Sequence, residues 1–238
     1  ECGYRLLKDG NIDKLRFQIR VMNANTGRIR VRNITPHTTK WTEAMFHATF
    51  FRRSIFGENG ITFNTSRNVG EDLYIQTIFN RHCKTFVCVP KTKYTFLYRE
   101  DSTSGVLTWK IPHCIDLQRE TCAAVQQEYT ALRAQNADDA AGLLLMFTKQ
   151  HYFMLLQFSR RLPYKDAVQY WHALRSIQCA NFPDYLQNRK ITLFRDNGEP
   201  FRFRAVLFLC AFFERHGLMS LFLRIYVRVS KCVRFQTK

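Results

Sequence analysis

Two adjacent carboxylates, Glu71 and Asp72, follow Gly70 at the start of an apolar-periodic run. The spacing of the apolar residues predicts a helix over residues 72–81, which would put both acids in or near its first turn. Unpaired backbone N–H groups and the helix dipole favour negative charge there, so a carboxylate stays ionised near neutral pH. Such a group can act as a general base. Acids are also common helix starters with no further role, and spacing alone does not separate the two interpretations.

Other polar and aromatic residues accompany this pair along the chain. Arginine forks suit phosphate oxygens, so an Arg pair can bind a donor phosphate or an acidic acceptor, although a solvated corner is an equal alternative. An Arg that follows a predicted strand can close over a site. The residues that could serve with the pair are Trp41, Arg52, Arg53, Arg99, Ser102 and Ser104.

Taken in order, these segments resemble the acceptor-side half of family 2 glycosyltransferases of the GT-A type. In that family a Trp precedes an F-R-R-x-x-F stretch. After it come an N-G-I-x-F turn, a G-E-D triplet and a strand that ends in Tyr-Arg and is followed by two serines. This chain has each piece in that order, with Phe96 in place of the first Tyr of the last strand. The resemblance covers residues 14–104, under half of the chain.

The resemblance implies an inverting enzyme that moves a sugar from a nucleotide-sugar donor to a glycan or lipid-linked acceptor, in cell-surface polysaccharide synthesis. It implies Asp72 as the general base. It further implies acceptor- or donor-binding roles for Glu71, Trp41, Arg52, Arg53, Arg99, Ser102 and Ser104.

The family also implies a divalent cation, Mg²⁺ or Mn²⁺, held by an Asp-x-Asp pair in a nucleotide-binding half that lies upstream of the segments matched here. This sequence has no Asp-x-Asp, so we expect no metal ligands in this chain. We therefore expect either a fragment of a longer transferase or a subunit that pairs with a separate donor half.

The charge balance points to an anionic partner. The 238 residues carry 36 Lys and Arg against 19 Asp and Glu, a net charge of +17, which suits nucleic acid, an acidic membrane or a phosphorylated molecule. The basic residues are spread along the chain without a zinc-finger or helix-turn-helix pattern, so we expect no nucleic acid. A basic nucleic-acid-binding module remains the alternative function, together with a non-catalytic acceptor-binding or scaffold subunit.

The segment from residue 201 to 229 interleaves apolar and basic residues. From Pro200 onward there are eight Lys and Arg and one acid, Glu214. The charges argue against a spanning helix, and the pattern is typical of a helix that lies in the headgroup region of an anionic leaflet. It predicts a cytoplasmic protein, peripheral at the inner face of the cell membrane; a core helix with a basic outer face is the alternative.

For the fold we expect the α/β class, in two parts. Residues 1–114 would be the C-terminal part of a GT-A-type, Rossmann-like mixed sheet, with a hairpin over 15–31 and strands over 83–89 and 94–98 separated by Pro90. Residues 115–238 would be a helical subdomain. Its expected helices cover residues 117–135, 138–161 and 164–178, and then 201–229 with an interruption at Gly217.

Overall fold

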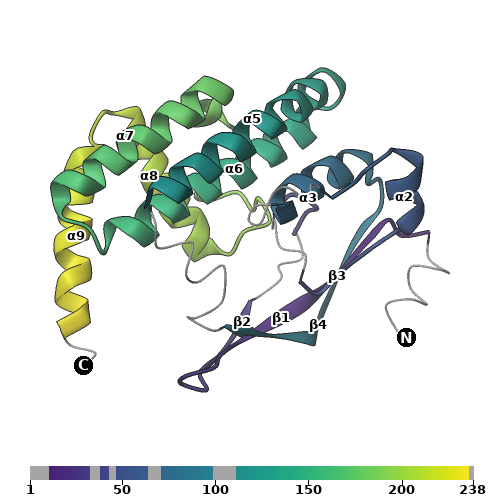
Figure 1. The fold of residues 1–238 in the computed structure, drawn as a ribbon, viewed down its shortest axis with the longest axis horizontal. Helices are drawn as coiled ribbons and strands as arrows, with labels where there is room; N and C mark the ends of the chain where they lie inside the picture. Colours follow the sequence, from purple (N-terminus) through teal and green to yellow (C-terminus); the bar gives the residue numbers. More distant parts are fainter. Residues whose placement is uncertain (1–10, 33–37, 43–46, 64–70, 99–110, 236–238) are drawn as a thin grey trace.

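The computed structural model describes residues 11–32, 38–42, 47–63, 71–98 and 111–235. These residues form a small mixed sheet of 4 strands together with 7 helices, and 60% of the structure is helical. All four strands precede residue 99, and the long helices follow residue 110. Figure 1 shows the sheet with α2 and α3 at one end of the molecule and the helices α5 to α9 at the other. The expected α/β class is confirmed.

The strand β1 (Lys14–Asn23) is the centre of the sheet. It pairs in parallel with β4 (Phe86–Tyr98) along its whole length. It pairs antiparallel with β2 (Ile29–Arg32) near its end and with β3 (Thr49–Phe51) near its start, so these two short strands share its other edge. The predicted hairpin is therefore confirmed, and its turn contains Gly27 at φ +64, a conformation that suits glycine.

The strand β4 differs from the expectation. The sequence predicts two strands separated by Pro90, but the structure has one continuous strand with a register shift opposite Gln18. Proline has no N–H group and cannot donate a hydrogen bond to a neighbouring strand. A β-bulge accommodates Pro90 here, because β1 is the one described strand that pairs with β4. The long partner strand β1 therefore overrides the local break.

Two helices pack at the end of the sheet where β1 starts. The short helix α2 (Arg53–Glu58) contributes Ile55, and α3 (Glu71–His82) contributes Ile75 and Phe79 to a shared core. This core contacts Phe51 and Phe86, the two register partners of Lys14 on the neighbouring strands. The helix expected over residues 72–81 is thus confirmed, and the sheet fixes where its first turn lies.

The remaining helices form a bundle. The first, α5, crosses the boundary expected between residues 114 and 115, and the predicted helices over 117–135, 138–161 and 164–178 are confirmed with shifted ends. The elements are α5 (Ile111–Gln135), α6 (Ala137–Ser159), α7 (Tyr164–Asn181), the 3-10 turn η1 (Tyr185–Gln187), α8 (Phe201–Arg215) and α9 (Met219–Phe235).

The ends of these helices follow capping rules. The side-chain oxygen of Asn136 accepts hydrogen bonds from the backbone N–H groups of Asp138 and Asp139, so Asn136 is the N-cap of α6. Asp138 and Asp139 lie in the first turn of the helix. After α8, Gly217 has φ +70 and breaks the predicted segment into two helices.

Candidate functional site

Asp72 is the second residue of α3, and its side chain is half-buried. Its neighbour Leu73 is buried in the core that also holds Trp41 and residues of α5 and α6. The carboxylate therefore stands in a first helical turn, where backbone N–H groups favour its ionised form. This is the position in the helix that the sequence predicts for Asp72.

The other candidate residues lie in different settings. Arg52 precedes α2, and its Nε donates to the backbone oxygen of Ile12 at 3.1 Å and lies 3.3 Å from Oδ1 of Asp13. Arg53, the first residue of α2, is exposed. The side chain of Glu71 is outside the described part of the structure, as are the residues Arg99, Ser102 and Ser104.

Trp41 is buried, with 3% of its surface exposed. Its indole Nε1 donates to Oδ1 of Asp139 at 2.8 Å, and its ring lies directly against Gly142 on α6. The aromatic ring is therefore covered by protein in this arrangement, where no sugar ring can stack on it. Its contacts fasten the segment 38–42 to the start of α6.

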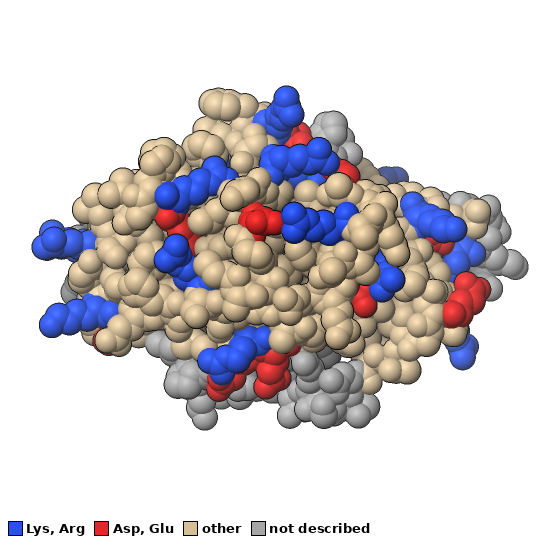
Figure 2. Space-filling model, turned by 90° about the horizontal axis from the view of Figure 1, so that it is seen from above, with Lys and Arg blue, Asp and Glu red and all other residues tan. Residues whose placement is uncertain are grey.

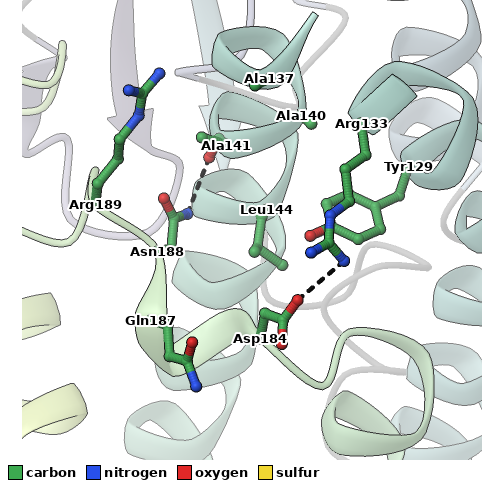
Figure 3. A pocket seen from close by; sticks show the side chains of 10 residues that line it. All are labelled: Tyr129, Arg133, Ala137, Ala140, Ala141, Leu144, Asp184, Gln187, Asn188 and Arg189. Atoms are coloured by element: carbon green, nitrogen blue, oxygen red, sulfur yellow. Dashed lines mark hydrogen bonds and ion pairs between the residues drawn. The ribbon is translucent and has the colours of Figure 1, made fainter. Parts of the chain in front are cut away.

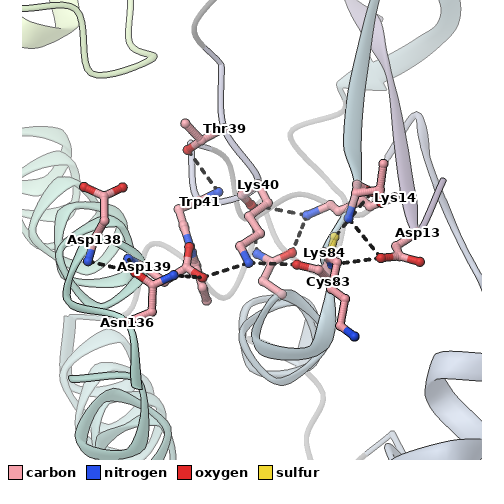
Figure 4. A network of polar contacts seen from close by, with 12 residues as sticks. Asp13, Lys14, Thr39, Lys40, Trp41, Cys83, Lys84, Asn136, Asp138 and Asp139 are labelled. Atoms are coloured by element: carbon pink, nitrogen blue, oxygen red, sulfur yellow. Dashed lines mark hydrogen bonds and ion pairs between the residues drawn. The ribbon is translucent and has the colours of Figure 1, made fainter. Parts of the chain in front are cut away.

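Lys40 extends this attachment into a polar network that joins the sheet, α3 and α6 (Figure 4). Its Nζ donates to Oδ2 of Asp139 at 3.0 Å and to the backbone oxygen of Cys83 at 2.8 Å. Its own backbone oxygen accepts from Nδ2 of Asn80 at 2.8 Å and Nζ of Lys14 at 3.3 Å. The network holds α3, which carries Asp72, in a fixed position relative to α6. Lys40 and Trp41, which bind Asp139 from outside α6, lie 99 and 98 positions away from it in the sequence.

Lys14 is the buried end of this network. Its Nζ donates to Oε1 of Gln76 at 2.9 Å and to Oδ1 of Asn80 at 2.8 Å, and it lies 5.5 Å from the ring centre of Phe51. Burial lowers the pKa of Lys14 from 10.5 to about 7, because the charged form loses its hydration. The amine is enclosed, so we assign it a structural role rather than a nucleophilic one.

A second polar cluster lies inside the helical bundle, around the buried carboxylate of Glu214. The hydroxyls of Tyr152 and Tyr185 donate to it at 2.7 and 2.5 Å, and Nε of Arg175 lies 3.2 Å from Oε1. His151 packs beside the cluster, and burial lowers its pKa to about 4, which keeps the ring neutral. Nε1 of Trp171 also donates to Oε1 at 3.4 Å, so four donors compensate the buried charge and the cluster stabilises the packing of α6, α7 and α8.

A cavity of about 400 Å³ opens between α5, α6 and η1 (Figure 3). Small side chains of α6, including Ala140 and Ala141, line one side of it. An ion pair between Arg133 and Asp184 lies along another side of the cavity, with 2.9 Å between Nη1 of Arg133 and Oδ2 of Asp184. The cavity has the size of a small-molecule site, but no residue that the sequence predicts for the site lines it.

Within the described ranges, no three His, Cys, Asp or Glu side chains are grouped so that they could hold a metal ion. None of the described helices combines the length and the apolar character that crossing a membrane requires. Comparisons with family models, with curated protein sequences and with solved structures gave no match.

Proposed function

We propose that this protein is an inverting glycosyltransferase that transfers a sugar from a nucleotide-sugar donor to a glycan or lipid-linked acceptor in cell-surface polysaccharide synthesis. The observation that carries the proposal is the position of Asp72, half-buried in the first turn of α3, within the ordered set of segments that resembles family 2. The polar network around Lys40 supports it, because a general base must be held in place by rigid elements.

In this mechanism Asp72 accepts the proton of the acceptor hydroxyl. The acceptor oxygen forms a bond to the anomeric carbon while the bond from that carbon to the nucleoside diphosphate breaks on the opposite face, which inverts the configuration. The diphosphate leaves with the electron pair. Among the candidate cations, Arg53 is exposed and is the better placed to meet phosphate oxygens, whereas Arg52 is engaged with Ile12 and Asp13. The family's cation has no Asp-x-Asp ligands in this sequence, so no step is assigned to a metal.

The test is Asp72→Asn in the protein as it is expressed from its gene. Transfer of radiolabel from a panel of UDP-, GDP- and dTDP-sugars to membrane acceptors is measured for the wild type and the variant. Loss of a general base lowers kcat by about 10²–10⁴-fold. The control is Asp116→Asn. Asp116 is an exposed acid of α5, and its described ion pair is with Arg119.

The control is expected to transfer at the wild-type rate. Wild-type turnover in Asp72→Asn would show that Asp72 is not the base. Acceptor binding by a wild-type protein that transfers no sugar from the whole panel would favour the non-catalytic acceptor-binding subunit instead.

The surface does not favour the nucleic-acid alternative. On the face shown in Figure 2, Lys and Arg side chains are spread over the molecule and several lie beside acids, rather than forming one continuous patch. Arg189 and Lys190, for example, both pair with Asp138. We further propose that the protein is cytoplasmic and peripheral at the inner face of the cell membrane.

A further inference from the structure

The helix α9 has one face buried against the bundle. Met219, Leu223 and Val227 are almost completely buried, at a spacing of four residues along the helix. Met219 and Leu223 pack in the core formed with α6, α7 and α8. Phe222 packs against the same core, and the hydroxyl of Tyr226 donates to the backbone oxygen of Leu156 at 3.0 Å, so this side of α9 faces the bundle.

The opposite face carries a second apolar row. Leu221, Ile225 and Val229 follow the same four-residue spacing and are 49%, 54% and 55% exposed. Single exposed apolar residues are ordinary, but three in register on one helix form a stripe, which marks an interaction surface. A helix that only completed a core would need the first row and not the second.

The charges beside this row have one sign. Arg224 and Arg228 are exposed and lie next to the apolar row on the helix surface. The sequence contains no Asp or Glu after Glu214, and it continues with Lys231, Arg234 and Lys238. In Figure 1, α9 lies at the end of the molecule opposite the sheet. The exposed face therefore combines apolar and cationic groups and suits a partner that is both apolar and anionic.

We propose that α9 lies in the plane of an anionic bilayer, with Leu221, Ile225 and Val229 at the boundary between headgroups and acyl chains. Arg224 and Arg228 then contact lipid phosphates. A second copy of this chain fits less well, because two such faces would oppose like charges, and nucleic acid would leave the apolar row in water. The inference deepens the proposed peripheral location and stands independently of Asp72.

The test is flotation of the full chain with vesicles of phosphatidylglycerol and phosphatidylcholine, or of phosphatidylcholine alone. The wild type is expected to float with the anionic vesicles, less so as salt increases, and weakly with the neutral ones. Arg224→Gln with Arg228→Gln is expected to lower partitioning about 30-fold, from about 1 kcal/mol per cation near an anionic surface. Ile225→Gln with Val229→Gln is expected to lower it by at least tenfold.

Matched controls come from an exposed loop far from α9 in sequence. Phe194→Gln and Arg195→Gln remove an exposed apolar residue and an exposed cation elsewhere, and both are expected to leave partitioning unchanged. Circular dichroism is used to check that each variant is folded. The proposal is overturned if the wild type does not float, or if the α9 variants float as well as the controls. It is also overturned if the α9 substitutions change only the sedimentation coefficient, since that outcome identifies a second copy as the partner.

Discussion

Gly142→Ala tests whether Trp41 is fixed against α6. A Cβ at position 142 would lie 2.6 Å from Cδ1 and 2.9 Å from Cγ of the Trp41 ring. Separations this short require movement, and the ring cannot move freely because it is buried and its Nε1 is bound to Asp139. The substitution therefore forces Trp41 or α6 to shift.

Two effects of opposite sign set the magnitude. Replacing glycine by alanine inside a helix stabilises it by about 0.5–1 kcal/mol when the new methyl group meets nothing. Overpacking a filled core costs about 1–3 kcal/mol. Because the methyl of Gly142→Ala meets a buried indole ring, overpacking prevails, and we expect the free energy of unfolding to fall by about 1–2 kcal/mol.

The measurement is urea unfolding followed by circular dichroism. Gly57→Ala is the matched control, since Gly57 lies in helix α2 and an added Cβ there has no atom within 4 Å. The free energy of unfolding of this control is expected to rise by up to about 1 kcal/mol. A double-mutant cycle with Trp41→Leu should recover part of the loss of Gly142→Ala, because the smaller side chain makes room for the methyl group.

Trp41 is not fixed against α6 if Gly142→Ala is as stable as the wild type or more stable, as Gly57→Ala is expected to be. That result would mean that the ring of Trp41 can move away from α6. Trp41 would then be available for the acceptor-binding role that the family resemblance implies.

Two further predictions concern the elements that hold α3 and α6. Lys14 titrates near pH 7 when folded and near 10.5 when unfolded, so between these values the unfolded state holds more protons. The free energy of unfolding should therefore rise with pH across that window, by up to about 1.4 kcal/mol per pH unit. Urea unfolding of Lys14→Met at several pH values should lack this rise. The same pH dependence in Lys14→Met and the wild type would disprove the role of Lys14. Asn136→Ala should lose about 1 kcal/mol of the free energy of unfolding, whereas Asn136→Ser retains a capping oxygen and should lose less; equal losses in thermal melts would contradict the cap.

The sequence by itself determined the local elements. Apolar periodicity identified α3, α6 and α7 within a few residues, and the hairpin followed from alternation around a Gly-containing turn. These features depend on neighbouring residues, which the sequence places side by side. The same reasoning put Asp72 in a first helical turn, since a helix start is also a local feature.

Tertiary structure decided what each element touches. The partners of Asp139 in the polar network are 98 and 99 positions away, and no spacing rule links them. The burial of Trp41 likewise depends on a glycine of a distant helix. The continuity of β4 across Pro90 depends on β1, which supplies hydrogen bonds on both sides of the bulge. Long-range packing alone sets these contacts, because their free energy comes from groups that meet only when the chain is folded.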